Sequence, residues 1–215
     1  IQQYELYATD DNLENIEKAE QKLIAENFPF LDKIIFTKNS EITYDEKTII
    51  SFSPGIPLYF PKPHPILELI DKSKAKLACD IEIFYRLNCN DDFIAITGTN
   101  GKSTVTALVG FLFEKLQLKS AIGGNIGKPC FDCEVKNSNK NTKTAFIFET
   151  SSFQLDLLSD SHFKISTLTN ITPDHLDRHN SMDEYIKAKK RVFNNQNQED
   201  FAIINIDNIE SRKVY

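Results

Sequence analysis

The sequence predicts an α/β protein with mainly parallel sheets, in which a Rossmann-like first part is followed by a second part of the P-loop ATPase type. Short β-prone runs alternate with helix-like runs along the chain, and this alternation is typical of strands joined by helical crossovers. One strand runs into "TGTNGKST" (97–104), where glycines precede a lysine and two hydroxyl residues. Such a loop is suited to binding phosphate groups.

The first half of the chain is predicted to consist of β-α steps. We expect a strand at 4–8, a helix within 10–27, strands at 33–36 and 48–52, and a helix that restarts near residue 65. Pro54 and Gly55 force a turn after the strand at 48–52. A polar stretch at 88–92 indicates a domain boundary, which we place between residues 90 and 91.

The second half has stronger signals. We expect a strand that ends at Thr97, a helix from 102 to about 116, strands at 144–149 and 165–171, a helix from 182 and a strand at 201–207. The polar segment 134–143 between these elements is predicted to be a surface loop.

Composition limits the function classes. The chain has 215 residues, of which 40% are hydrophobic and 26% charged, and a net charge of −6. These values are ordinary for a globular protein, and the acidic balance does not favour a nucleic-acid partner. No apolar run approaches the roughly 18 residues of a membrane helix, and residues 1–10 do not resemble a signal peptide. We therefore expect a cytoplasmic protein that does not bind membranes.

Four cysteines raise the question of a metal or redox site. Cys130 and Cys133 form one C-x-x-C pair, but Cys79 and Cys89 are not spaced as a second pair. We favour reduced structural thiols over a zinc site or a redox pair.

The loop at 97–104 departs from the usual P-loop spacing, which would need a glycine where this chain has Ile96. Gly98 and Gly101 still let backbone N–H groups approach phosphate oxygens, and a helix that starts near Lys102 adds a partial positive charge. Lys102 would reach the outer phosphates, and Ser103 or Thr104 could hold Mg²⁺. The alternative is a glycine-rich turn before a helix.

Glu149 is the second candidate, because it stands at the carboxyl end of the predicted strand 144–149. Ligands of open α/β sheets bind at that edge, so this carboxylate could complete a Mg²⁺ site. The alternative is that Glu149 caps the start of a following helix.

A polar cluster follows the predicted strand at 165–171. It contains Asp174, His175, Asp177, Arg178 and His179. The two histidines are four residues apart and could bind zinc from one helix face, although the H-E-x-x-H glutamate is missing. Ligation of a hard cation by His175 and a plain capping cluster are the other interpretations.

Lys189 lies in an unexpected place on the helix that starts at residue 182. Ser181 and Glu184 form a capping box that supports this start. At about 100° per residue, Lys189 falls inside the apolar arc of the helix, which contains Met182, Tyr185, Ile186, Val192 and Phe193. Burial would lower the lysine pKa and favour the neutral amine, which can react with CO₂ to form a carbamate. Without other information, a side chain that extends to solvent is the simpler interpretation.

Five motifs together resemble the Mur ligase family in order and spacing. They are "GTNGKST" (98–104), "GGNIG" (123–127), "ETSSFQL" (149–155), "NITPDHLDRH" (170–179) and "YIKAKKRVF" (185–193). The resemblance covers nearly the whole chain and is strongest over 93–207. The second and third motifs point to the member that adds D-glutamate, rather than to the ligases that add the other residues or to folylpolyglutamate synthase.

The resemblance implies a domain plan of three parts. Residues 1–90 would be the UDP-substrate-binding Rossmann-like domain without its first strand, and residues 91–215 would be a truncated central ATP-binding domain. The C-terminal domain, which supplies the D-glutamate site, would be absent, so this chain alone would not turn over. A non-catalytic nucleotide-binding fragment is the alternative from another class.

The resemblance also implies an activity and its ligands. The enzyme would be a monomer that uses ATP and Mg²⁺ at two sites to join D-glutamate to UDP-N-acetylmuramoyl-L-alanine through an acyl phosphate, in peptidoglycan precursor synthesis.

Site residues follow from the matching motif positions. The ATP cradle would comprise Gly98, Thr99, Asn100, Gly101, Lys102, Ser103 and Thr104. Ser103 and Glu149 would hold one Mg²⁺, and His175 and a carbamate on Lys189 would hold the second. The substrate contacts would be Asp10 on uracil and Asn125, Ser151 and Gln154 on the muramoyl-peptide. With Lys102, the residues Glu149, His175 and Lys189 form the expected catalytic set. One departure is Cys79, which stands where the family usually has glycine.

Overall fold

The computed structural model describes residues 5–125, 127–138 and 141–215. The chain divides into two compact units, one formed by the residues up to Thr48 with Glu68–Ala75, and the other by Ile49–Leu67 with Lys76–Tyr215. The boundary predicted between residues 90 and 91 from sequence remains a prediction.

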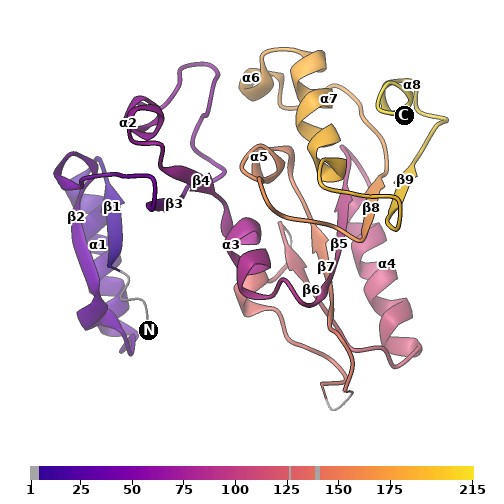
Figure 1. The fold of residues 1–215 in the computed structure, drawn as a ribbon, viewed down its shortest axis with the longest axis horizontal. Helices are drawn as coiled ribbons and strands as arrows, with labels where there is room; N and C mark the ends of the chain where they lie inside the picture. Colours follow the sequence, from indigo (N-terminus) through magenta and orange to yellow (C-terminus); the bar gives the residue numbers. More distant parts are fainter. Residues whose placement is uncertain (1–4, 126, 139–140) are drawn as a thin grey trace. The chain divides into compact units, whose positions relative to one another are not determined.

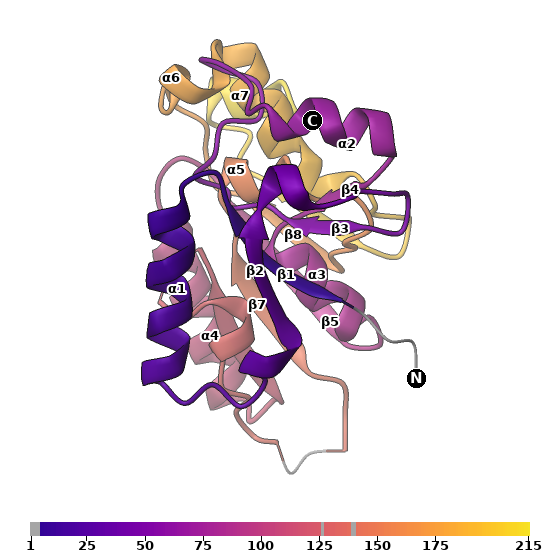
Figure 2. The same ribbon diagram turned by 90° about the vertical axis from the view of Figure 1, so that its left-hand side faces the viewer.

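The first unit contains a β-α-β step. Strands β1 (Leu6–Asp10) and β2 (Ile34–Lys38) pair in parallel, and helix α1 (Leu13–Ala25) connects them, with short 3₁₀ turns at Leu31–Lys33 and Asn39–Glu41. Figure 2 shows α1 running alongside the two strands. The helix begins where the Asn12 side chain accepts a hydrogen bond from the Glu14 N–H, as expected of an N-cap asparagine. Most of helix α2 (Ile66–Ser73) also belongs to this unit.

The second unit begins with a small parallel pair, β3 (Ile49–Ser51) with β4 (Lys76–Ala78), followed by helix α3 (Asp80–Leu87). Glu82 on α3 is fully buried. Its carboxylate accepts hydrogen bonds from the backbone N–H groups of Ser159, Asp160 and Ser161 and from both serine hydroxyls. Arg86 pairs with the same carboxylate at 2.9 Å. The segment 159–161 is therefore held against α3.

A five-stranded parallel sheet forms the centre of this unit, in the order β6-β7-β5-β8-β9 (Figure 1). The strands are β5 (Asp92–Thr97), β6 (Ser120–Gly124), β7 (Ala145–Glu149), β8 (Ile165–Leu168) and β9 (Phe201–Ile204). The connecting helices are α4 (Lys102–Lys115), α5 (Ser152–Leu155), α6 (Leu176–His179) and α7 (Met182–Lys190), and α8 (Ile209–Arg212) follows β9. Short 3₁₀ turns lie at Cys130–Asp132 and Arg191–Phe193.

The two faces of the sheet are covered by different helices. Ile94, Ile96 and Ile147 form a buried cluster with apolar residues of α4, including Val105 and Val109. The alternate residues point to the other face, where the rings of Phe93, Phe146 and Phe148 surround Phe84 of α3 at centroid distances of 4.9–6.3 Å. Because β5 lies between the helix layers, its sequence is almost continuously apolar.

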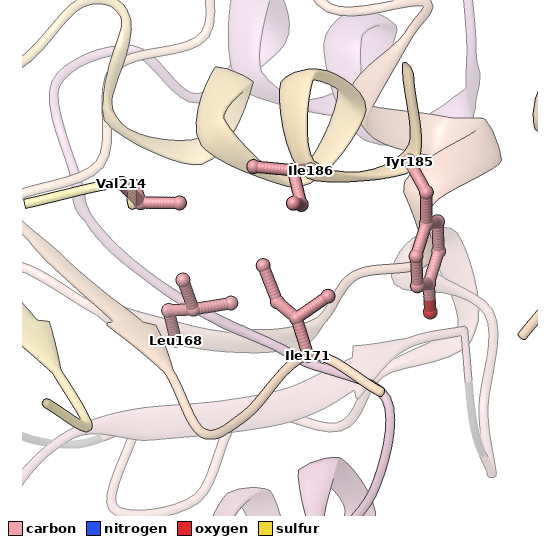
Figure 3. Close-up of a cluster of buried hydrophobic side chains, with 5 residues drawn as sticks. All are labelled: Leu168, Ile171, Tyr185, Ile186 and Val214. Atoms are coloured by element: carbon pink, nitrogen blue, oxygen red, sulfur yellow. The ribbon is translucent and has the colours of Figure 1, made fainter. Parts of the chain in front are cut away.

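Helix α7 packs through a separate cluster near the end of β8. Its buried members are Leu168, Ile171, Tyr185, Ile186 and Val214 (Figure 3). This cluster fixes α7 over the segment that follows β8, which begins at residue 169.

The α/β class with mainly parallel sheets is confirmed. Two strands are shorter than the sequence predicts. The polar residues near their predicted ends lie outside the sheet, although β-prone residues stand next to them. The predicted strand at 165–171 ends at Leu168, and the one at 201–207 ends at Ile204. Strand β6 was not identified as a strand. Tyr4, Ile126 and residues 139–140, which belong to three predicted features, lie outside the described residues.

The four cysteines are free thiols, and Cys79 and Cys130 are buried. Burial raises the pKa of Cys79 to about 12. Within the described ranges, none of the helices has the length and hydropathy needed to cross a membrane.

Candidate active site

The loop between β5 and α4 has a shape that requires glycine. Gly98 has a φ of +147°, and a Cβ atom there would lie 2.0 Å from the Thr169 hydroxyl oxygen. Gly101, the N-cap of α4, has a φ of +81° with open space where a Cβ atom would stand. Gly98 thus allows a close backbone approach, and Gly101 supplies the left-handed turn that starts the helix.

The segment after β8 holds this loop in place. Asn170 accepts a hydrogen bond from the Asn100 N–H at 2.9 Å through its side-chain oxygen and donates to the Asn100 carbonyl, also at 2.9 Å, through its side-chain nitrogen. The Thr99 N–H donates to the Asn170 carbonyl at 2.9 Å. Lys102 donates from its Nζ to the Thr99 carbonyl at 2.8 Å. The loop is therefore shaped before any ligand binds, and Lys102 lies along it.

Glu149 ends β7 beside the loop and is 2% exposed. Its Oε1 accepts a hydrogen bond of 3.1 Å from the side chain of Asn125, which follows β6. Its Oε2 is buried and has no hydrogen-bond partner among the described residues. Buried carboxylate oxygens are normally satisfied, so an orphaned one at this edge fits a missing cation.

Ser151 and Gln154 form the capping box of α5, immediately after β7. The Gln154 Oε1 accepts from the Ser151 N–H at 3.1 Å, and its Nε2 donates to Asp80 Oδ1 at 3.2 Å. Gln154 and Asp80 line a cleft of about 460 Å³, together with Asn125 and residues 51–54. The predicted substrate residues Asn125 and Gln154 therefore share one cleft, and Asp80 is a neighbour that the sequence did not reveal.

His175 and His179 occupy different environments. His175 has a left-handed backbone with φ +52° and an imidazole about half exposed. His179 is buried, and its Nε2 lies 2.9 Å from the Ser152 hydroxyl. Both rings contact Phe153, at centroid distances of 5.1 and 5.3 Å. Burial lowers the pKa of His179 to about 4.

The zinc interpretation of this histidine pair finds no support in these positions. His179 is the last residue of α6, but His175 is the N-cap that precedes this helix. The two histidines therefore do not lie on one helix face, as the zinc interpretation required. Across the described parts of the chain, no group of three or more His, Cys, Asp or Glu side chains could hold a metal ion. The remaining interpretation of His175, as a ligand to a hard cation beside phosphates, stays a prediction.

Lys189 is 2% exposed, so the interpretation that its side chain extends to solvent is wrong. Its Nζ donates to the Gly98 carbonyl at 2.8 Å and lies 4.7 Å from the centre of the Tyr185 ring. Burial lowers the Lys189 pKa to about 7; Lys102 lowers it further, and Asp174 and Glu149 oppose the shift. A neutral amine is therefore accessible near neutral pH, at a position where the charges of Lys102, Asp174 and Glu149 all act on the lysine.

The strand order explains why these groups meet. Strand β5 lies between β7 and β8, and the loops after all three strands leave the sheet at the same edge. This is the switch point at which open α/β sheets bind ligands. The edge collects the 98–104 loop, Glu149 and the segment after β8, and α7 adds Lys189. Ser103 and Thr104 lie in the first turn of α4, whereas Asp10 ends β1 in the other compact unit.

The family model described as the Mur ligase middle domain matches residues 96–215. The UDP-N-acetylmuramoylalanine--D-glutamate ligase of Rickettsia prowazekii (strain Madrid E) is 38% identical over 181 residues, which cover 84% of this chain and 38% of that ligase. The ligase of the same name from Wolbachia pipientis wMel is 37% identical over 204 residues, covering 94% and 36%. The chain thus spans less than two fifths of the length of these relatives.

Two solved structures share the fold at low sequence identity. The UDP-N-acetylmuramate:L-alanyl-gamma-D-glutamyl-meso-diaminopimelate ligase from Neisseria meningitides superposes with a TM-score of 0.57 at 12% identity, over 98% of this chain and 66% of that one. A UDP-N-acetylmuramoyl-L-alanyl-D-glutamate--2,6-diaminopimelate ligase gives 0.51 at 18% identity, over 99% and 45%.

Proposed function

This chain belongs to the Mur ligase family, and from that membership we propose that it is part of an ATP-dependent ligase that joins D-glutamate to UDP-N-acetylmuramoyl-L-alanine. The observation that carries the proposal is the arrangement at the sheet edge. The phosphate-type loop, the unpartnered carboxylate oxygen of Glu149 and the buried Lys189 lie together at one switch point. The names of the relatives support the choice of substrates.

ATP would bind at the loop of residues 98–104. The first N–H groups of α4 have no intrahelical partner, so they can donate to phosphate oxygens at the positive end of the helix. Lys102, which lies along the loop at the Thr99 carbonyl, would turn from that oxygen to the outer phosphates. The loop needs little rearrangement, because Asn170 already holds Asn100 from both sides.

Magnesium fits the residues that surround the loop. Ser103 and Glu149 would hold one ion, since the buried Glu149 Oε2 lacks a partner among the described residues. His175 and a carbamate on Lys189 would hold a second. When bound, the ions would supply positive charge that lets a carboxylate approach the triphosphate.

The carbamate is supported by the environment of Lys189. The ammonium form would first lose a proton; the neutral amine nitrogen would then form a bond to the carbon of CO₂ and lose a second proton, so that in total a cation becomes an anion. Burial lowers the pKa of Lys189 to about 7, so the neutral form is well populated near pH 8.

The reaction would proceed in two steps. An oxygen of the alanine carboxylate forms a bond to the γ-phosphorus while the β–γ bridging bond breaks, giving an acyl phosphate and ADP. The D-glutamate amine then attacks the carbonyl carbon, phosphate leaves, and the nitrogen loses a proton to form the amide. Lys102 would stabilise the charge on the transferred phosphoryl group.

The substrate would lie along the cleft that Asn125, Gln154 and Asp80 line. Asn125 and Gln154 would contact the muramoyl-peptide, with Ser151 beside them in the capping box. We further propose that residues 1–90 bind the uridine part, with Asp10 on uracil, and that residues 91–215 bind ATP.

Phosphate release by the full-length protein tests this proposal. We expect release only when ATP, UDP-N-acetylmuramoyl-L-alanine and D-glutamate are all present. Release with the D-glutamate replaced by L-glutamate, or with folate as acceptor, at the same rate would overturn the assignment. Binding of ATP and uridine nucleotides without any release would instead favour the non-catalytic alternative.

A further inference from the structure

Tyr185 lies one helical turn before Lys189 on α7 and is 1% exposed. Its ring belongs to the buried cluster under α7, where Figure 3 shows it beside Ile171 with its hydroxyl end directed away from Ile186. A tyrosine in such a place contributes apolar area like a phenylalanine, and its hydroxyl needs a polar partner.

That partner is the Thr99 hydroxyl, 3.2 Å away in the phosphate-type loop. The same Thr99 hydroxyl accepts from the Thr172 N–H at 3.0 Å and faces the Thr172 carbonyl at 3.2 Å. A carbonyl can only accept, so the single Thr99 hydroxyl proton is donated to Thr172. Because a threonine hydroxyl has one proton and two lone pairs, Tyr185 must be the donor to the remaining lone pair.

Thr99 is also the loop residue that Lys102 contacts, through its carbonyl oxygen at 2.8 Å. The hydroxyl of Tyr185 therefore acts on the residue against which Lys102 rests. The neighbouring residue, Gly98, is held from the same helix, because Lys189 donates to its carbonyl at 2.8 Å. Two residues of α7 thus hold two consecutive residues of the loop.

The Tyr185 ring connects these two contacts. The Lys189 Nζ lies 4.7 Å from the ring centroid, so the ring forms one wall of the space that the end of the lysine side chain occupies. The ring therefore limits where the lysine side chain can lie, while the hydroxyl limits where Thr99 can lie.

We propose that Tyr185 is a positioning residue of the nucleoside triphosphate site. Its hydroxyl fixes the loop at Thr99, and its ring separately fixes the side chain of Lys189. The inference rests on the proposed function for its ligand, since ATP is the molecule that the loop would bind. If Tyr185 only filled the core, neither its hydroxyl nor its ring would affect the binding of the nucleotide.

Tyr185→Phe in the full-length protein tests the hydroxyl. We expect the dissociation constant for a non-hydrolysable ATP analogue with Mg²⁺, measured by calorimetry, to rise about fivefold, as for the loss of one buried hydrogen bond. The KM for ATP should rise similarly with a smaller change in kcat. The matched control is Tyr85→Phe, because Tyr85 is a partly buried tyrosine that packs on Phe93, away from the loop. We expect its dissociation constant to equal that of the wild type.

Tyr185→Leu tests the ring. It removes the hydroxyl and also the face above which Lys189 lies, so we expect kcat to fall about tenfold further than in Tyr185→Phe. Equal kcat values in the two variants would overturn the part of the inference that concerns Lys189.

A double-mutant cycle keeps the test independent of general damage to the fold. Thr99→Val removes the acceptor of the Tyr185 hydroxyl, so the Thr99→Val/Tyr185→Phe double variant should bind the analogue no more weakly than Thr99→Val alone. Additive losses, or wild-type affinity in Tyr185→Phe, would overturn the inference while the wild-type protein still binds. If the wild-type protein itself binds no analogue, the proposed function fails and the inference fails with it.

Discussion

Lys189 and Gly98 are joined by a hydrogen bond of 2.8 Å from the lysine Nζ to the glycine carbonyl, although 91 positions separate them in the sequence. The bond connects the buried face of α7 to the first residue of the phosphate-type loop. It places a lysine with a lowered pKa beside the loop that would bind ATP.

Lys189→Ala should reduce phosphate release by the full-length protein about 100-fold or more, because it removes the amine whose carbamate would hold the second Mg²⁺. Short carboxylates or high chloride should partly restore the rate, since these anions can occupy the place of a carbamate. Lys190→Ala is the control, as Lys190 is the exposed neighbour on the same helix. Full activity in Lys189→Ala would exclude a catalytic role for this lysine.

Glu149→Gln should weaken the binding of Mg²⁺ or Mn²⁺ in the presence of nucleotide about tenfold or more. The change keeps the size of the side chain and removes the charge that a cation would neutralise at Oε2. Electron paramagnetic resonance of bound Mn²⁺ would measure it. In Glu134→Gln the changed side chain is 80% exposed, so metal affinity should stay at the wild-type level. The same affinity in Glu149→Gln would remove this carboxylate from the metal site.

Glu82→Ala should lower the free energy of unfolding by about 3–5 kcal/mol, because Arg86 and the donors of residues 159–161 would lose their buried acceptor. Burial opposes ionisation of Glu82, but the hydrogen bonds from Ser161 and its neighbours outweigh it and lower the pKa of this carboxyl. Urea denaturation would measure the loss. Glu114→Ala, at an exposed ion pair with Lys136, should leave the free energy of unfolding nearly unchanged. Equal losses in the two variants would contradict the anchoring role of Glu82.

Asp156 should give the free energy of unfolding a pH dependence of its own. Burial raises the pKa of its carboxyl to about 6, against the opposing effect of Arg191, while the unfolded chain has the ordinary value of 3.8. Between these values the folded state binds more protons, so stability falls as pH rises from about 4 to about 6. Asp156→Asn should remove this slope, a change on the order of 3 kcal/mol across the interval.

Urea denaturation at a series of pH values would test the Asp156 prediction. The comparison variant is Asp207→Asn, whose exposed carboxylate should leave the slope as in the wild type. A slope that persists in Asp156→Asn would assign it to another group.

The sequence predicts which residues form the candidate site better than it predicts the residues with which buried polar side chains form hydrogen bonds. The 3.6-residue period placed Lys189 on the buried arc of its helix, and the glycine spacing marked the loop, because both signals are local. The partners come from distant segments: Gln154 donates to Asp80 across 74 positions, and Glu82 accepts from Ser161 across 79. No local pattern predicts such pairs. The left-handed backbone of His175 could not be predicted either, because a histidine adopts that conformation far less often than a glycine does.

The strand order has a consequence for how the protein folds during its synthesis on the ribosome. Strand β5 is made first but pairs with β7 and β8, which end at Glu149 and Leu168. The loop after β5 is held by Asn170 and Thr172, and α7 contacts it through Tyr185 and Lys189. A nascent chain that has emerged only as far as residue 160 therefore has the whole nucleotide-loop sequence and no nucleotide site. Affinity for ATP should arise in one step during translation, as the chain beyond residue 189 leaves the exit tunnel.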